Sequence, residues 1–566
     1  MNRRLGVSLA MLAVGVGLLT TAQLAGAVRD SASLTKGGVF RVGTTGASVQ
    51  VDPQLAYIST AWWLEYATAA KLYNYPDRKG PSGTVLVPEV ASRFAISNGG
   101  KKYTFWIRKG FRFSDGTRVT AENFRYAIDR VANLGRPPGW PWSPGLQFIN
   151  DPKGAEIVGV QEVVDERATH VSGVRVKGNR LIIRLTRPDG TFLSKITMPF
   201  FQATSTKLPL RREVVNVDGV DHLPAAGPYF MTRNDVNQLT SIRQNPFWKR
   251  GPGRYRPRNL AGVDIQWNLN EQTAFNQVKN NELDEGPLPA AEVKGIADQY
   301  GVNKTRFWSK PVNCTGYLPM NMENDLFKGN PNLRKAVAYA IDRKAYIAQV
   351  GPYAGNTWSH LFNPGVPGWR NVNPYPLDRP NLTKARQLAA GHFRDGKITV
   401  YYRSSGTINP AQAQVVRQDL INLGFEPGNI TMKGFSGSMP YDPMGVRGND
   451  ADLAVSYGWC SNYPDPYDWI NVLLYGGFIQ AENNVNYSYM DLPKWNRKME
   501  AAAKLVGPQR FKVYGQMDID IMRQVAPMAV ERTYNNRYFF SNRVDPKSLV
   551  YQGIYSDWSI PALALK

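Results

Sequence analysis

Strand-like and helix-like segments alternate along almost the whole of this 566-residue chain, and no repeat of fixed period divides them. The clearest are a strand over 103–108, a hairpin of 174–176 with 181–185, a helix over 333–350 and a strand over 452–458. Such alternation is typical of α/β proteins. Because one hydrophobic core rarely serves more than about 250–300 residues, we predict two large α/β lobes.

The N-terminal segment has the pattern of an export signal. Arg3 and Arg4 precede an uncharged apolar stretch over 5–27 that ends in Ala25-Gly26-Ala27, a sequence that signal peptidase accepts. We therefore expect a mature chain that begins at Val28 and acts in the periplasm or at the outer face of the cytoplasmic membrane. An uncleaved anchor is the alternative, since about 20 apolar residues span a bilayer. No cysteine lies near the cleavage point, so we expect no lipid anchor there.

The chain contains two cysteines, Cys314 and Cys460. An even number of cysteines in an exported chain favours a disulfide, with two separate buried thiols as the alternative. A disulfide that closes so long a loop contributes on the order of 4–5 kcal/mol in the chain-entropy account.

The charge of the chain is strongly positive. Lys and Arg number 68 against 45 Asp and Glu, a net charge of +23, which raises the question of an anionic partner such as nucleic acid, lipid head groups or cell-wall polymer. The basic residues are scattered, and only 249–258 forms a local cluster, which we interpret as a solvated loop. This scatter argues against a nucleic-acid partner.

Sequence motifs of catalysis are missing. The chain has no H-E-x-x-H or C-x-x-C spacing, no nucleophile elbow, no phosphate loop and no dinucleotide fingerprint after a strand. We therefore predict that the protein is not an enzyme and uses no metal or cofactor. The abundant Trp, Tyr and Asn near strand ends are typical of a binding cleft. The four histidines are widely separated: His170, His222, His360 and His392.

Several segments, in the same order, resemble landmarks of the extracytoplasmic solute-binding proteins of ABC importers, in the large oligopeptide- and dipeptide-binding family, family 5. The most specific is YTFWIRKGFRFSDGTRVTAEN (103–123), which is similar to the family's Y-T-F-x-L-R-x-G-V-K-F-S-D-G-x-P-V-T-A-E-D. GWCSNYPDP (458–466) is similar to G-W-x-A-D-Y-P-D-P. The other landmarks lie at 87–91, 227–229, 245–248, 281–284 and 321–347.

The resemblance implies a periplasmic-binding-protein-like fold in which two α/β lobes, joined by crossing hinge strands, close on a ligand. Residues 28–75, 190–312 and 531–566 would form lobe one, 76–189 an extra domain inserted in it, and 313–530 lobe two. The implied function is capture of dipeptides or oligopeptides between the lobes and their delivery to ABC permease subunits, by a monomer.

The family also implies a disulfide and a ligand contact. Some members join cysteines at the positions of Cys314 and Cys460. Peptide-binding members hold the ligand's α-ammonium with a carboxylate two residues later, where this chain has Asn462, an amide that supplies hydrogen bonds but no charge. Asp465 could replace that carboxylate, or it could cap a helix that begins near Pro466.

A second implied contact is Arg403, where dipeptide-binding relatives place an arginine for the ligand carboxylate. For the aromatic candidates, packing in the core is the alternative to ligand contact. The remaining cleft candidates are Thr45, Gly46, Asn321, Tyr457 and Trp459.

Two alternatives to peptide import stay open. Because Asn462 lacks the charge, the same fold could bind a non-peptide solute: an oligosaccharide, an opine-like conjugate or a metal chelate. Restoring the carboxylate by Asn462→Asp should strengthen binding only if peptides are the ligands. The other alternative is an exported hydrolase or a basic cell-envelope scaffold, which would bind anionic polymer in a salt-dependent way.

Overall fold

The computed structural model describes residues 34–134, 143–151, 155–211, 223–435, 441–482, 484–505 and 507–566. The predicted signal segment and His222 lie outside these residues. Within the described ranges, no helix has the length and apolar character needed to cross a bilayer.

An eight-stranded mixed sheet forms the base of the molecule. β1 runs parallel to its neighbours β10 and β11, while the other pairs are antiparallel. In sheet order the strands are β16 (Tyr457–Cys460), β12 (Phe307–Pro319), β17 (Met528–Phe540), β11 (Glu285–Gly286), β1 (Val39–Gly43), β10 (Gly262–Gln266), β9 (Leu239–Gln244) and β8 (Tyr229–Asp235).

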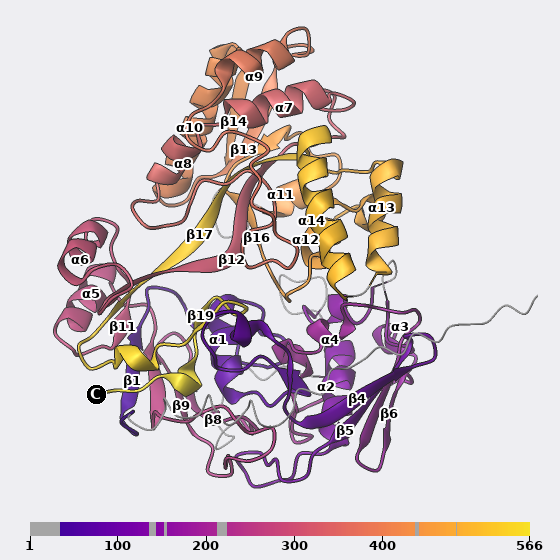
Figure 1. The fold of residues 1–566 in the computed structure, drawn as a ribbon, viewed down its shortest axis with the longest axis vertical. Coiled ribbons are helices and arrows are strands. Elements are labelled where there is room, and N and C mark those ends of the chain that lie inside the picture. The colour runs from indigo at the N-terminus through magenta and orange to yellow at the C-terminus, as the bar shows by residue number, and fades with distance from the viewer. Residues whose placement is uncertain are drawn as a thin grey trace, which may run out of the picture.

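Two long strands connect the halves of the molecule. β12 and β17 pair antiparallel from Phe307 opposite Phe539 to Pro319 opposite Met528, and they run from the lower half of the molecule into the upper half (Figure 1). The register shifts between Val312 and Thr315. This is the two-lobed α/β architecture that the resemblance implied.

The lower half contains the lobe we call the first lobe, whose two hydrophobic clusters include strand residues Phe40 and Val263 in one and Phe307 and Phe539 in the other. The helices α1, α5 and α6 and two small hairpins complete it (Figure 1). Their bounds are α1 (Ser59–Thr68), α5 (Glu271–Lys279), α6 (Val293–Tyr300), β2 (Tyr73–Asn74), β3 (Val87–Pro88), β18 (Tyr551–Gln552) and β19 (Asp557–Trp558).

Beside the first lobe lies the inserted domain, a four-stranded antiparallel sheet in the order β4-β5-β7-β6 with its own core. Its main helix begins after Thr120, whose backbone N–H donates to Asn123 Oδ1 over 2.8 Å in a capping box. The elements are β4 (Ala91–Ser97), β5 (Lys102–Ile107), β6 (Val174–Lys177), β7 (Arg180–Arg184), α2 (Ala121–Asn133) and α3 (Val160–Val164). The short helix α4 (Phe192–Lys195) begins just beyond the predicted boundary at 189, and its Phe192 packs in the same core.

The upper half is the second lobe, whose single core lies between Tyr317 and Val530 in sequence. Its parallel three-stranded sheet has the order β14-β13-β15. The elements are β13 (Ile398–Arg403), β14 (Ile430–Phe435), β15 (Leu453–Ala454), α7 (Pro331–Ala340), α8 (Arg343–Ala348), α9 (Leu382–Ala389), α10 (Ile408–Leu423), α11 (Tyr441–Gly445), α12 (Tyr467–Leu474), α13 (Pro493–Ala503) and α14 (Gly507–Gln524). The lobe boundaries given above stay a prediction.

Two elements differ from their prediction. The expected helix over 333–350 is two helices, α7 and α8, because the side chain of Asp342 accepts the N–H of Ala345 and starts a new helix. The expected strand over 452–458 is divided into β15 and β16, with Ser456 at φ 66° between them.

The basic cluster 249–258 is solvated only in part, which corrects our interpretation. Lys249 and Arg250 are exposed, but Arg256 is buried and its Nη2 lies 2.7 Å from Oε1 of the buried Glu89. Arg256 therefore belongs to the core of the fold.

Candidate ligand-binding cavity

A cavity of about 890 Å³ lies between the inserted domain and the second lobe. The inserted domain contributes the end of α2, the segment 143–151 and parts of α3 and α4. The second lobe contributes the segment after β16, α12 and the stretch 477–486. Protein sites for small ligands usually measure about 300–1,000 Å³, so this cavity can hold a solute of several hundred daltons.

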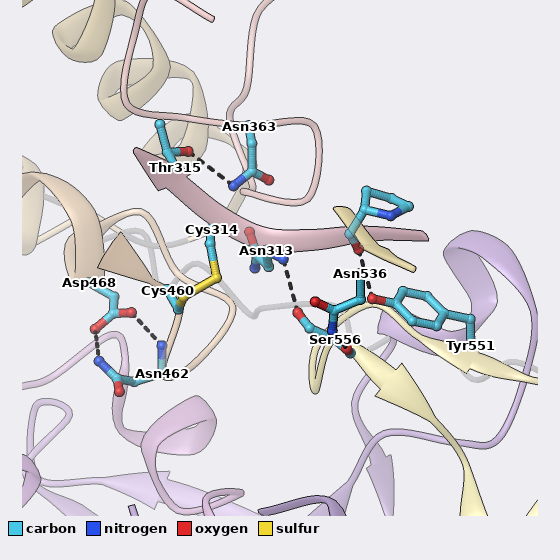
Figure 2. The surroundings of a disulfide bond; sticks show 11 residues. Asn313, Cys314, Thr315, Asn363, Cys460, Asn462, Asp468, Asn536, Tyr551 and Ser556 are labelled. Carbon is cyan, nitrogen blue, oxygen red and sulfur yellow. Dashed lines mark hydrogen bonds between the residues drawn. A yellow bond between two sulfur atoms is a disulfide. The ribbon is translucent and has the colours of Figure 1, made fainter. Parts of the chain in front are cut away.

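The disulfide between Cys314 and Cys460 is present, as predicted, and it lies beside this cavity. The two cysteines face each other in the antiparallel pair of β12 and β16, so the bond ties the crossing strand to the segment that enters the cavity wall (Figure 2). Two of the predicted ligand contacts, Trp459 and Asn462, line the cavity next to it.

Hydrogen bonds within the protein occupy the amide of Asn462. Its Nδ2 donates to Oδ1 of Asp468 over 3.0 Å, and its backbone N–H donates to Oδ2 of the same carboxylate over 2.7 Å (Figure 2). Its Oδ1 accepts the hydroxyl of Tyr57 over 2.8 Å. Asn462 therefore holds Asp468 in place and links the second lobe to the first.

Asp468 is a candidate site residue that our sequence reasoning missed. It lies in the first turn of α12, is 0% exposed and lines the cavity. Burial raises the pKa of its carboxyl to about 7, although hydrogen bonds from Asn462 lower it. Among the described residues no Lys, Arg or His forms an ion pair with it. The site thus holds a buried carboxyl group whose charged form lacks a cation.

Asp465, three residues earlier, is in a different situation. Its carboxylate accepts Nη2 and Nε of the buried Arg510 over 2.8 and 3.1 Å, and it accepts the N–H of Tyr467 at the start of α12 over 2.8 Å. It is not part of the cavity lining. Asp465 therefore pairs with Arg510 and accepts the first N–H of α12, away from the cavity lining.

The other predicted contacts lie away from the cavity lining. Tyr457 is 1% exposed and packs against the ring of Tyr487 in the core of the second lobe, with the ring centroids 5.0 Å apart. Asn321 is buried in the same lobe, where its N–H donates to the carbonyl of Asp452. Arg403 ends β13, paired with Phe435 of β14.

Thr45 and Gly46 are exposed at the end of β1, outside the cavity lining. The Gly46 carbonyl accepts the N–H of Asn268 over 3.0 Å, which ties this loop to the strand β10 side of the first lobe. The structure thus brings together two of the eight predicted ligand contacts at this cavity.

Two basic side chains that follow the inserted domain in sequence also line the cavity on its side. Lys195 is buried and its Nζ lies 2.9 Å from Asp189 Oδ2, and this carboxylate helps to keep the pKa of the lysine above its ordinary value despite burial. Arg211 is exposed and its Nε donates to Asn133 Oδ1 over 3.2 Å. In the described part of the chain, no carboxylate forms an ion pair with Arg211.

Aromatic rings complete the walls from both sides. Phe148 of the inserted domain and Tyr463 of the second lobe meet edge to face, with centroids 6.1 Å apart. Trp459, Tyr467 and Phe478 lie on the second-lobe side of the lining. Rings of this kind give a small ligand large apolar contacts, while the few polar groups set its orientation.

Comparison with known proteins gives consistent matches over nearly the whole chain. The chain is 23% identical over 514 residues to Heme-binding protein A of Haemophilus influenzae, covering 88% of this chain and 87% of that protein. It is 23% identical over 540 residues to the Dipeptide-binding protein of Escherichia coli, covering 88% and 93%. The solved structure of Clavulanic acid biosynthesis oligopeptide binding protein 2 superposes with a TM-score of 0.80 at 22% identity, covering 94% and 96%.

Residues 85–480 match the family described as bacterial extracellular solute-binding proteins, family 5 middle. This match spans well over half of the chain and includes both walls of the cavity. The chain belongs to the bacterial extracellular solute-binding proteins of family 5.

Proposed function

We propose that the protein is the solute-binding component of an ABC importer. It holds short peptides in the cavity between the inserted domain and the second lobe, and it delivers them to permease subunits in the cytoplasmic membrane. The observation that carries the choice of ligand is Asp468, a buried carboxyl group that lines the cavity and has no cation partner among the described residues.

An α-ammonium group is the partner that this carboxyl group lacks. A buried carboxylate is costly without an opposite charge, and a buried cation has the same need, so each stabilises the other where the cavity excludes water. Asn462 occupies the position of the family's usual carboxylate and donates two hydrogen bonds to Asp468. We infer that the anionic contact has moved six residues along the chain and that Asn462 orients it.

The rest of the lining is compatible with a peptide. Arg211 provides a positive charge for a terminal carboxylate, while Lys195 is already neutralised by Asp189. The aromatic side chains offer apolar surface to ligand side chains without demanding one shape. The volume suits a peptide of a few residues rather than a long one.

The test combines a change in the protein with a change in the ligand. We would measure, by calorimetry at pH 7.5, binding of a short peptide with a free amino terminus and of its N-acetylated form to the wild type and to Asp468→Asn. The free peptide should bind the variant at least tenfold more weakly, since a charge-assisted hydrogen bond is lost. The acetylated peptide should bind both proteins equally.

Asp325→Asn is the matched control, because Asp325 is exposed and lies outside the cavity lining. It should leave both affinities unchanged. If Asp468→Asn weakens the free and the acetylated peptide equally, the ammonium contact is not at Asp468. If neither peptide binds the wild type, the peptide assignment is wrong.

A non-peptide solute is the second candidate, and Asn462 is the observation that favours it. One relative is named for binding heme, which shows that proteins similar to this one are not confined to peptides. Native mass spectrometry of the protein isolated from its own host would separate the two. A ladder of short peptides supports peptide import, whereas one non-peptide species would establish the alternative.

Further parts of the proposal concern the whole chain. We propose that residues 1–27 are a cleaved signal, that the mature protein acts as a monomer outside the cytoplasm, and that 76–189 is the inserted domain. Intact-mass measurement of the exported protein would test the cleavage site before Val28. Light scattering would test the monomer.

A further inference from the structure

The outward face of the inserted domain's sheet is a second candidate for a functional surface. Alternate residues of β4, β5, β7 and β6 point away from the domain core, while Phe105, Leu181 and Ile183 point into it. The helix α2 contacts β6 and β7. The sheet lies at the outer edge of the lower half of the molecule, with β4, β5 and β6 at its margin (Figure 1).

This outward face is basic. We call it the basic face and define it by six side chains, all exposed or half-buried, on the four strands. The four strands contain no Asp or Glu at any position. The six side chains are Arg93, Lys102, Arg175, Lys177, Arg180 and Arg184.

Cross-strand pairing places like charges opposite each other. Lys102 lies opposite Arg184, and Lys177 lies opposite Arg180. Like charges at directly opposed positions destabilise a sheet, so this arrangement costs the isolated domain stability. Among the described residues, none of the six cations forms an ion pair. The fold therefore maintains an uncompensated positive surface at a cost to its own stability.

Elsewhere on the described surface, some basic residues are paired with acids. Arg447 pairs with Glu323, and Lys294 pairs with Asp298. On the basic face, the guanidinium carbon of Arg93 lies 3.6 Å from the ring centroid of Trp106. Trp106 is half-buried and lies opposite Arg180, so the face combines an aromatic ring with surrounding cations.

We propose that the basic face docks the protein on an anionic phospholipid surface, the outer face of the cytoplasmic membrane. The cations are spread over four strands in two dimensions, whereas a linear polyanion is usually bound in a groove that follows its backbone. A flat array of cations matches a flat array of phosphate head groups. Trp and basic side chains are also the residues that favour the interface between a bilayer and water.

This inference does not depend on which ligand the cavity holds. Docking would concentrate the protein on the surface where its permease lies, and it would be electrostatic. Its strength should therefore decrease steeply as salt is added, because the contacts are exposed to solvent.

The test measures binding to lipid vesicles by flotation. The protein would begin at Val28, so that it retains every residue the structure describes without the apolar N-terminal segment. Vesicles of phosphatidylcholine with and without phosphatidylglycerol would be compared at 50 and 500 mM salt. The wild type should bind the anionic vesicles at low salt only.

The variant Arg175→Gln/Lys177→Gln/Arg180→Gln removes three cations from the basic face. Each lost cation should reduce the partition coefficient about fivefold, so the triple variant should lose on the order of 100-fold. Lys304→Gln/Lys384→Gln/Arg497→Gln is the control with the same net charge, and it changes exposed residues outside the face. Circular dichroism would show that both variants are folded.

The proposal is overturned if the two triple variants lose binding equally, because net charge alone would then explain it. It is also overturned if the wild type ignores anionic vesicles but binds soluble polyphosphate, since the partner would then be a polymer. Retained vesicle binding by the basic-face variant would likewise contradict it.

Discussion

Two buried carboxyl groups of this protein have opposite surroundings. Between the inserted domain and the first lobe, Oε1 of Glu89 lies 2.7 Å from the guanidinium of Arg256, and its Oε2 accepts the backbone N–H of Lys71 over 2.8 Å. At the cavity, Asp468 is equally buried and accepts hydrogen bonds from Asn462, but among the described residues no cation pairs with it. The comparison suggests a division of roles. The protein itself supplies the cation for Glu89, which stabilises the fold, whereas the cation for Asp468 is to come from the ligand.

The largest decrease in stability is expected from breaking the ion pair between Glu89 and Arg256. Arg256→Met leaves Glu89 buried without its guanidinium and also frees the carbonyl groups of Tyr66 and Ala69 that Arg256 binds. The free energy of unfolding in urea should decrease by about 3–5 kcal/mol. Lys249→Met, at an exposed position of the same loop, should change it by less than about 0.5 kcal/mol. Adding Glu89→Met to Arg256→Met should recover part of the loss, and no recovery would contradict the pairing.

A somewhat smaller effect should follow from making Asp465 resemble Asp468. Arg510→Met removes the guanidinium from Asp465 but keeps its hydrogen bond to Tyr467. The free energy of unfolding should decrease by about 3 kcal/mol, with Lys512→Met on the same helix as the exposed control. Because Asp465 is outside the cavity lining, ligand affinity of the folded variant should change by less than tenfold. A loss of affinity without a loss of stability would assign Asp465 to the ligand instead.

The carboxyl group of Asp468, which lacks a cation partner among the described residues, should make the stability of the protein depend on pH. Its pKa is about 7 in the folded protein and 3.8 ordinarily, so between pH 4 and 7 the folded state binds more protons than the unfolded state. Its contribution to stability is full below pH 4 and is lost as the pH rises to 7. Relative to the wild type, Asp468→Asn should therefore gain about 2 kcal/mol between pH 5 and pH 8. Equal pH profiles of unfolding for the two proteins would contradict this pKa.

The smallest decrease in stability is expected from removing the hydrogen bond that Tyr57 of the first lobe donates to Asn462. Tyr57→Phe removes the hydroxyl that donates to Asn462 Oδ1. The free energy of unfolding should decrease by about 1 kcal/mol, the usual contribution of one hydrogen bond. Tyr475→Phe, which removes a hydroxyl bonded to the exposed Glu500, should cost less. An equal or larger cost for Tyr475→Phe would show that the bridge between the lobes contributes little.

The fold and one wall of the cavity were predictable from the sequence. The ordered landmarks identified two lobes and crossing strands, and two cysteines at landmark positions identified the disulfide. Trp459 and Asn462 follow from the same segment and do line the cavity. Motifs of this kind are informative because their residues are close in the chain.

The opposite wall of the cavity could not be predicted from the sequence. Nor could the sequence show which of Asp465 and Asp468 faces the cavity. Described residues between 132 and 211 line the opposite wall, far away in the sequence, and only the tertiary fold brings them near. Asp465 and Asp468 stand three residues apart, and which one faces the cavity depends on where α12 begins. Asp465 instead pairs with Arg510 on α14, a contact between distant segments that no local pattern reveals.

The position of β17 has a consequence for how the protein matures. This strand is near the end of the chain, yet in the eight-stranded sheet it lies between β12 and β11. Until residues 528–540 have been synthesised, the large sheet has a gap in its middle, and the two halves of the molecule are held by one crossing strand. Since domains tend to fold in the order in which they emerge, the sheet of the first lobe must be completed last. The two crossing strands that connect the halves of the molecule can therefore pair only after nearly all of the chain has been made.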